Sequence, residues 1–495
     1  MVSRLMSQQK RERSPQVSRH VNPIPKLIFL AIGPALVLGG LWRLTGSQDN
    51  SPAPAPNAIA VMSSSSPQTP VLSARRTPAV LSRETSAVGF EQALRPLGGA
   101  VLPGSCAAVS IDGVLSLSDG IDTPVVPAST TKFIVGAVAL DILGPTFTFT
   151  TEVKAEISAG VVGSIYLVGG GDPLLSTAWY PKDAKYSKYE QEPATSLEAL
   201  ADAVVAAGVT QINGNIVGDA SHFDSELYAP SWPIEFRAIQ GGPIAALLVN
   251  DGLVFGDSSR SSDPAFGAAR EFTRLLKERG VMILGAPTSG QSPVGIATVA
   301  SISSAPLVDI VGEMLRNSDN NTAEMILKEL GFRAQGAATR AAGISAVMNI
   351  LTNWGIDLEG VTFSDGSGLS RDNKVTCAAF LQILERFTFD DPLVSQMAVA
   401  GVSGTLSDYF IGGPLEGRLR AKTGSLGGVK ALVGFVEVQG ASVIRFALLL
   451  QTPGIHEEAA FTPLWEGILA NALGTYPTGP GVDEVGPLSV INAGL

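Results

Sequence analysis

The segment PASTTKFIVGAVAL, residues 127–140, constrains the fold more than any other part of this sequence. It predicts a helix over 129–142 that is almost entirely apolar, yet Lys132 follows Ser129 by three residues. Residues three apart share a face of a helix, so the ammonium group and the hydroxyl can meet inside a cleft. One interpretation is a capping serine and a lysine that extends its charge to water. The other is a nucleophile with its base, since burial lowers the pKa of a lysine toward neutral pH.

Two further short motifs carry groups that suit the second interpretation. Ser318–Asn320 lies between two predicted helices, where its Ser and Asn can both face one cleft. The alternative is a cap for the helix that begins near Thr322. Lys422–Gly424 lies on a predicted strand, where the glycine lets a substrate backbone approach closely. The alternative is a charged strand end followed by a turn glycine.

The composition argues against several classes of function. The net charge of −11 and the pI near 4.9 argue against nucleic-acid binding, which needs clustered Lys and Arg. No Cys/His cluster has the spacing of a metal site, so we expect no structural or catalytic zinc site. Cys106 and Cys377 could form one disulfide in an exported protein or remain two separate buried thiols.

The N-terminal part divides into three segments before the folded region. Residues 1–26 are basic and are predicted to stay in the cytoplasm. Residues 27–43 contain the uncharged run Leu27–Trp42, which as a helix would be about 24 Å long. This run predicts a transmembrane anchor, with a cleaved signal as the alternative, and an exported C-terminal part. Residues 44–88 are rich in Pro, Ser and Ala and predict a semi-extended linker.

The rest of the chain alternates between predicted strands and helices. Residues 106–120 predict a hairpin that turns at Asp112–Gly113, and two long apolar strands are predicted near the C-terminus. Short strands, including AALLVNDGLVF (245–255), are predicted within residues 155–303. The pattern predicts a sheet with helices packed on its faces.

The order S-x-x-K, S-x-N, K-T-G resembles that of the active-site serine penicillin-interacting proteins. The separation of 189 residues between Ser129 and Ser318 exceeds that of β-lactamases. The stretches GGGDPLLS, GPIAALLVNDG and DGSGLSR are typical of low-molecular-mass class C penicillin-binding proteins. The sequence is identified as a member of their D-alanyl-D-alanine carboxypeptidase/endopeptidase family, peptidase family S13.

This resemblance implies an α+β fold. A β-lactamase/transpeptidase-like catalytic domain, an antiparallel sheet with helices on both faces, would comprise residues 89–154 and 304–480. An inserted strand-rich domain would comprise residues 155–303. Because the insert carries none of the three motifs, we expect it to influence which wall polymer is reached and not the acylation chemistry. DGSGLSR (365–371) is expected to be a tight Gly-rich loop that shapes the cleft.

The resemblance also implies a role for each motif residue. Ser129 attacks the penultimate D-alanine carbonyl, Lys132 accepts its proton, and Ser318 relays a proton to the departing D-alanine. The predicted substrate-binding residues are Asn320, Lys422, Thr423, Gly424 and Ser425. The mechanism implied by the resemblance needs no metal or other cofactor. We expect Lys132 to be neutral and Lys422 to keep its charge, because two nearby cations disfavour each other's protonation.

The implied activity is that of a serine-type D-Ala-D-Ala carboxypeptidase that acts outside the cytoplasm, on the cell-wall or periplasmic side, as an anchored or secreted protein. Its substrates would be peptidoglycan stem peptides that end in D-Ala-D-Ala, and β-lactam antibiotics would be covalent inhibitors. DD-endopeptidase activity on cross-links stays open. A β-lactamase, or a non-catalytic peptidoglycan-binding protein with the same fold, is the alternative.

Overall fold

The computed structural model describes residues 78–180, 193–438 and 442–476. The predicted cytoplasmic segment 1–26 and the predicted anchor 27–43 lie outside these residues. Within the described part of the chain, no helix is both long enough and apolar enough to cross a membrane.

The end of the predicted linker is helical, so that part of the prediction is wrong. Helix α2 extends over Pro78–Ala100, whereas the linker was expected to reach residue 88. Phe90, Leu94 and Leu97 recur at helical spacing and are at most 2% exposed. This apolar stripe packs on the protein, and its period shows why the chain is helical and not extended here.

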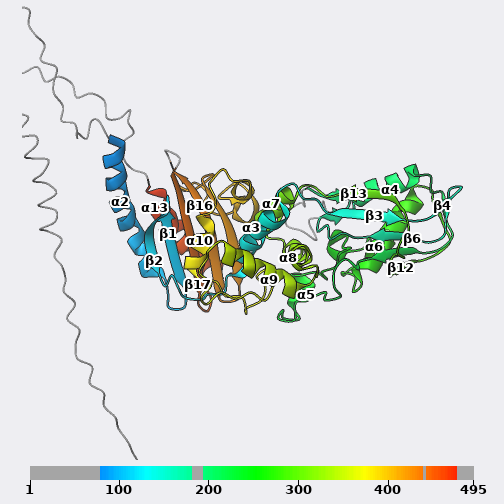
Figure 1. Cartoon of the computed structure of the whole chain (residues 1–495). Helices are drawn as coiled ribbons and strands as arrows, with labels where there is room; N and C mark the ends of the chain where they lie inside the picture. Colours follow the sequence, from blue (N-terminus) through cyan, green and yellow to red (C-terminus); the bar gives the residue numbers. More distant parts are fainter. Residues whose placement is uncertain (1–77, 181–192, 439–441, 477–495) are drawn as a thin grey trace, which may run out of the picture. The chain divides into compact units, whose positions relative to one another are not determined.

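A six-stranded antiparallel sheet forms the framework of the catalytic part, in the order β14-β15-β16-β17-β1-β2 (Figure 1). The β1–β2 hairpin turns at Asp112–Gly113, as predicted, and both residues have positive φ, which suits a two-residue turn. The strands are β1 (Cys106–Ile111), β2 (Val114–Asp119), β14 (Ala398–Val399), β15 (Leu419–Leu426), β16 (Val429–Val438) and β17 (Ser442–Gln451).

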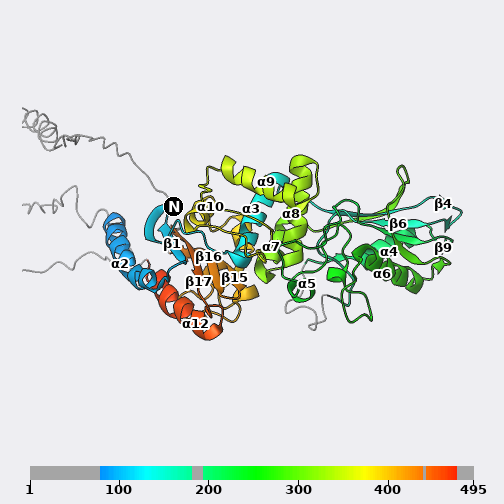
Figure 2. The ribbon, with the colours of Figure 1, turned by 90° about the horizontal axis from the view of Figure 1, so that it is seen from below.

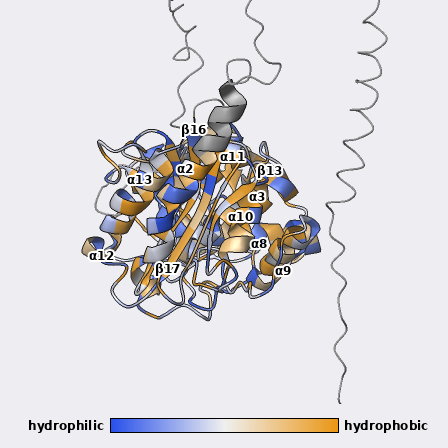
Figure 3. Ribbon diagram, turned by 90° about the vertical axis from the view of Figure 1, so that its left-hand side faces the viewer, coloured by the Kyte–Doolittle hydropathy of each residue, from blue (hydrophilic) through white to orange (hydrophobic). Residues whose placement is uncertain are grey.

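Both faces of the central part of this sheet are buried, which explains why strands β16 and β17 are largely apolar. Side chains alternate between the faces, so Ala447 and Leu449 join one core while Phe446 and Leu448 join the other. Figure 3 shows these strands coloured as hydrophobic between the helices. The first core contains residues of α3, α7, α8, α9 and α10, and the second contains residues of α2, α12, η4 and α13.

The helices of the two layers come from distant parts of the chain. Figures 1 and 2 agree that α3, α7, α8 and α9 lie between the six-stranded sheet and the inserted region. Their bounds, with those of the other helices outside the insert, are η1 (Ala128–Thr130), α3 (Thr131–Leu143), α7 (Leu307–Asn317), α8 (Asn320–Gln335), α9 (Arg340–Asn353), α10 (Cys377–Leu384), α11 (Pro392–Ser395), η3 (Gly404–Leu406), α12 (Glu458–Thr462), η4 (Pro463–Leu469) and α13 (Ala470–Gly474).

The inserted region has sheets of its own. One has the order β12-β10-β6-β3-β13, another β11-β9-β5-β4, and β7 pairs with β8. The strands are β3 (Thr150–Lys154), β4 (Ile157–Ser158), β5 (Val161–Val162), β6 (Ile165–Val168), β7 (Leu175–Ser176), β8 (Thr195–Ser196), β9 (Gln211–Ile212), β10 (Ile216–Asp219), β11 (Met282–Ile283), β12 (Pro287–Ser289) and β13 (Thr298–Ser303). The helices are α4 (Leu197–Ala206), α5 (Phe236–Ile239), η2 (Asn250–Gly252) and α6 (Pro264–Glu278). The division into domains stays a prediction. Strand β3 was assigned to the catalytic domain, 89–154, but it pairs with β6 and β13 of the inserted region and not with the six-stranded sheet.

The strand predicted over residues 245–255 is absent. Residues 245–254 are buried, but the run leads into η2, where Asn250, Asp251 and Gly252 all have positive φ. A strand requires negative φ, so three left-handed residues in succession end any extended pairing. Burial alone therefore explains the apolar composition of this run.

Cys106 and Cys377 form a disulfide, so the alternative of two separate thiols is wrong. The Cα atoms lie 5.9 Å apart, and 271 positions of sequence separate the two residues. The bond joins β1 to the first residue of α10 and links the catalytic sheet to a helix that packs on it.

Candidate active site

Ser129 and Lys132 lie where the predicted helix begins. Ser129 belongs to the short helix η1, Lys132 to the first turn of α3, and the lysine Nζ lies 2.9 Å from the serine Oγ. The preceding residue, Ala128, has a φ of 49°, a left-handed conformation that is uncommon for a residue with a side chain. The ammonium group of Lys132 does not reach water, because the residue is 0% exposed. The interpretation as a capping serine with an extended surface lysine is therefore wrong.

Two distant segments complete the surroundings of the Lys132 ammonium group. Its Nζ donates to the Oδ1 of Asn320 at 2.6 Å and to the carbonyl oxygen of Ser367 at 2.6 Å. With Ser129, these contacts fix the amino group from three directions. Burial lowers the pKa of Lys132 to about 8, although the carboxylates of Asp319, Asp365 and Glu324 oppose this shift.

The second motif, Ser318–Asn320, both caps a helix and places side chains next to the two lysines. Asp319 is the N-cap of α8, and its Oδ1 accepts a hydrogen bond from the backbone N–H of Thr322 at 2.6 Å. Ser318 ends α7 in a left-handed conformation, with a φ of 65°, and its Oγ lies 2.8 Å from the Nζ of Lys422. Capping by the middle residue thus leaves the flanking side chains free to contact the two lysines, Ser318 at Lys422 and Asn320 at Lys132.

The third motif lies on β15, as predicted. Lys422 is fully buried, the Thr423 Oγ1 lies 2.9 Å from the Oγ1 of Thr405, and Ser425 is exposed. A Cβ on Gly424 would lie 2.7 Å from the carbonyl oxygen of Pro127. The glycine is therefore needed for the close approach of β15 to the serine-bearing segment, and it is not a turn residue.

The electrostatic surroundings of the two lysines differ. Burial lowers the pKa of Lys422 well below its usual value, and the charge of Lys132 lowers it further. Three carboxylates raise the pKa of Lys132, whereas none contributes at Lys422. Burial and the neighbouring Lys132 thus disfavour the charged form of Lys422, and a bound anion would favour it. The expectation that Lys422 keeps its charge stays a prediction.

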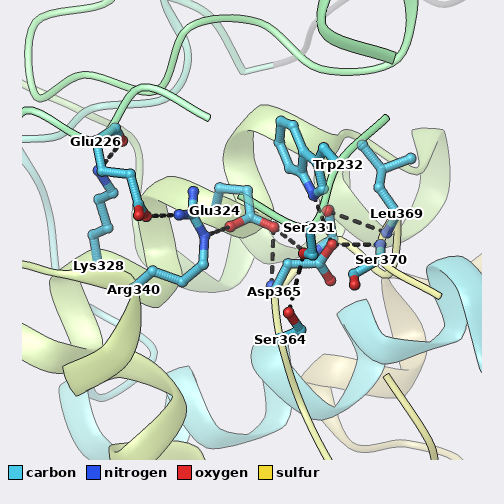
Figure 4. Close-up of polar contacts among 12 residues, drawn as sticks. Glu226, Ser231, Trp232, Glu324, Lys328, Arg340, Ser364, Asp365, Leu369 and Ser370 are labelled. Carbon is cyan, nitrogen blue, oxygen red and sulfur yellow. Dashed lines mark hydrogen bonds and ion pairs between the residues drawn. The ribbon is translucent and has the colours of Figure 1, made fainter. Parts of the chain in front are cut away.

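Sequence reasoning missed the contact that the DGSGLSR loop makes with the lysine. The loop was expected only to shape the cleft, but its Ser367 carbonyl accepts a hydrogen bond from Lys132. Asp365 stabilises the loop by accepting from the backbone N–H groups of Gly368 and Ser370 and from the Nε1 of Trp232 (Figure 4). The density of Gly and Asp in this stretch was the available signal of a backbone-presenting loop.

The insert also contacts the second motif. The carbonyl of Gln240 accepts from the Nδ2 of Asn320 at 2.6 Å. The side chain of Asn321 bridges the backbone N–H of Gly242, at 2.7 Å, and a carboxylate oxygen of Asp251, at 2.9 Å. These contacts hold the start of α8 and argue against our expectation that the insert leaves acylation unaffected.

The comparison with solved structures defines the class of fold. The structure of penicillin binding protein 4 from Haemophilus influenzae aligns with a TM-score of 0.65 at 23% identity, over 77% of this chain and 99% of that chain. The fold is therefore that of a penicillin-binding protein, and the predicted α+β architecture is confirmed.

The comparison of sequences identifies the family. The profile of the D-Ala-D-Ala carboxypeptidase 3 (S13) family matches residues 112–260 and 255–463. A carboxypeptidase from Mycobacterium tuberculosis is 32% identical over 375 residues, which cover 70% of this chain and 76% of the relative. A D-alanyl-D-alanine carboxypeptidase from Actinomadura sp. is 29% identical over 63% of this chain and 70% of the relative. The chain belongs to the S13 family, as the three motifs predicted.

Proposed function

We propose that this protein is a serine-type D-alanyl-D-alanine carboxypeptidase that removes the terminal D-alanine from peptidoglycan stem peptides. The Oγ of Ser129 attacks the carbonyl carbon of the penultimate D-alanine, and its proton passes to the Nζ of Lys132. The C–N bond then breaks, and the departing D-alanine nitrogen takes up a proton through Ser318. Water hydrolyses the resulting ester and frees the serine.

The position and pKa of Lys132 carry this proposal. Its amino group lies 2.9 Å from the Ser129 Oγ, within the reach that a general base needs. The pKa of about 8 means that a neutral fraction is present near physiological pH. No histidine is required beside this pair: the Nε2 of His222 lies 2.7 Å from Glu329, and the Nδ1 of His456 accepts from the backbone N–H of Gly428.

The remaining motif residues bind the substrate and the developing charge. Asn320 holds the substrate amide, while Lys422 and Thr423 bind the terminal carboxylate. A bound carboxylate raises the pKa of a neighbouring lysine, so substrate binding would favour the charged form of Lys422. The backbone N–H groups of Ser129 and Ser425 form the oxyanion hole, commonly the largest contribution in acyl transfer.

We also propose that the protein acts outside the cytoplasm and is held there by residues 27–43. The disulfide between Cys106 and Cys377 supports an oxidising compartment. A reporter fused after Leu495 should be active only outside the membrane. Activity of that reporter in the cytoplasm alone would contradict this location.

The test combines two substrates with one variant. Native protein should release free D-alanine from diacetyl-Lys-D-Ala-D-Ala and should form a stable penicillin adduct, seen by intact mass. Ser129→Ala should lose both activities and keep its thermal unfolding temperature. Ser221→Ala, which alters an exposed serine of the insert, is the control and should retain both.

Other outcomes would point to the alternatives. Labelling retained in Ser129→Ala would refute the assignment of the nucleophile. Rapid turnover of nitrocefin would favour a β-lactamase, and the absence of any adduct would favour a non-catalytic protein. Cleavage of cross-linked muropeptide dimers without release of D-alanine would favour an endopeptidase.

A further inference from the structure

Glu324 is a buried carboxylate to which the proposed mechanism gives no function. It lies on α8, one helical turn after Asn320, and is 0% exposed. Its Oε1 accepts hydrogen bonds from the backbone N–H groups of Gly366, at 2.9 Å, and Ser367, at 2.8 Å. A carboxylate buried in a protein costs free energy, so its retention at this position calls for a specific reason.

The peptide that Glu324 holds is the one that contacts the lysine. The backbone N–H of Ser367 donates a hydrogen bond to the Glu324 carboxylate, and the carbonyl oxygen of Ser367 accepts one from the Lys132 Nζ at 2.6 Å. The next residue, Gly368, packs so closely that a Cβ there would lie 1.9 Å from the carbonyl oxygen of Ala128. The loop is therefore fixed between Glu324 on one side and the serine-bearing segment on the other.

The second carboxylate oxygen of Glu324 is held by an arginine. The Nε of Arg340 donates to its Oε2 at 3.0 Å, and Arg340 also forms an ion pair with Glu226 of the insert. Figure 4 shows Glu226, Arg340 and Glu324 following one another toward the loop. Both oxygens of Glu324 thus have partners, and the charge is compensated on the side away from the lysine.

We propose that Glu324 is a positioning residue for the proton acceptor: it fixes the backbone of Ser367 so that the carbonyl of this residue aims the Lys132 amino group at Ser129. The proposal rests on the function proposed above, in which Lys132 takes the serine proton. Glu324 touches neither the nucleophile nor the substrate and acts only through the loop.

The charge of Glu324 adds a second effect that can be measured separately. The charged groups that act on Lys132 are the carboxylates of Asp319, Asp365 and Glu324, which raise its pKa, and the charge of Lys132 in turn lowers the pKa of the nearby Lys422. Burial raises the pKa of Glu324 to about 8, and Asp365 raises it as well. With this pKa, Glu324 is ionised mainly above pH 8, where its charge delays the deprotonation of Lys132. Removal of the charge should therefore increase the neutral fraction of Lys132 in that pH range and have little effect well below it.

Two variants separate position from charge. Glu324→Gln keeps an oxygen that can accept from both N–H groups but removes the charge. We expect the acylation rate with benzylpenicillin to fall about 3- to 10-fold at pH 6.5, where native Glu324 is mostly uncharged, and by less at pH 8–9, where the native carboxylate is ionised and delays the deprotonation of Lys132. Glu324→Ala removes the acceptor as well and should lower the rate about 100-fold, the scale of an ångström-size misplacement. Glu329→Gln is the matched control, since Glu329 is also buried on α8 and paired with an arginine, but it contacts His222 and Arg333 and not the loop.

The results distinguish this inference from the proposed function. If native protein is not acylated, the function itself fails. If native protein is acylated and Glu324→Gln lowers the rate by the same factor at every pH, as a general loss of stability would, the role of Glu324 is refuted. Equal effects of Glu324→Gln and Glu329→Gln would also refute it. If Glu324→Ala does not fold, Glu324→Gln alone decides through the pH dependence of its rate ratio to native protein.

Discussion

The acylation rate should rise with pH because the reactive form of Lys132 is the neutral one. The pKa of Lys132 is about 8, so the neutral fraction is about one eleventh at pH 7, one half at pH 8 and ten elevenths at pH 9. If proton acceptance by Lys132 limits acylation, the rate constant should increase about tenfold between pH 7 and pH 9. The sign follows from burial: the folded protein favours the uncharged amine, and deprotonation begins well below the usual range of lysine.

The assay is the second-order rate constant of acylation by one β-lactam, followed by intact mass between pH 6 and pH 10. Lys132→Arg should eliminate acylation across this range, because a guanidinium does not release its proton there. Lys422→Arg should retain part of the rate, since it keeps a positive charge at the carboxylate site. That permanent charge should also move the rise in rate to lower pH, because a neighbouring cation disfavours protonation of Lys132.

Two results would refute this reasoning. A rate constant that stays level from pH 7 to pH 9 in the native protein would mean that Lys132 is not the group whose deprotonation matters. Equal and mild losses in Lys132→Arg and Lys422→Arg would mean that Lys132 is only a structural cation. Thermal unfolding of each variant must accompany the rates, since both lysines are fully buried.

Three further predictions follow from the geometry. Replacement of Cys106 and Cys377 by Ala should lower the free energy of unfolding by up to about 5–6 kcal/mol, on the chain-entropy estimate for a loop of 271 residues. The unfolding temperature should fall accordingly, and an unchanged temperature would contradict the disulfide. Gly368→Ala should nearly abolish penicillin labelling because its Cβ collides with backbone, whereas Gly336→Ala, which also has positive φ but meets no atom within 4 Å, should retain it. Asn321→Ala should lower acylation by releasing the insert from the start of α8, and a native rate in that variant would show that these contacts are dispensable.

The sequence was sufficient for the local part of the site. Ser129 and Lys132 are joined by helical spacing, which depends on three consecutive peptide units and not on the rest of the fold. The same holds for the order of side chains in Ser318–Asn320, where the outer residues contact the two lysines and the middle residue caps α8. Local geometry of this kind can be read from a single stretch of sequence.

The electrostatics of the site could not be predicted in this way. The carboxylates that raise the pKa of Lys132 come from α8 and from the 365–371 loop, nearly 190 residues and more beyond the lysine. Their distance from Lys132, and the absence of any carboxylate contribution at Lys422, are set by how the helices pack. The causes that shift the two lysine pKa values therefore depend on tertiary contacts that no motif encodes.

The insert illustrates how a region can be separable in topology and still contribute to the site. Strand β3, which directly precedes the predicted insert, and strand β13, which ends it, are antiparallel neighbours with Thr150 opposite Ser303, so the predicted insert begins and ends at one place. An insertion whose two ends are adjacent need not disturb the six-stranded sheet. Ser129 and Ser318 can therefore lie in one site although 189 residues separate them in the sequence. The loops at the inner end of the insert nevertheless supply the Gln240 carbonyl to Asn320 and the Glu226 carboxylate to Arg340. A polymer that bound the insert and moved these loops would therefore act on the same helix that holds Asn320 and Glu324, and the insert would affect both where the enzyme binds and how fast it is acylated.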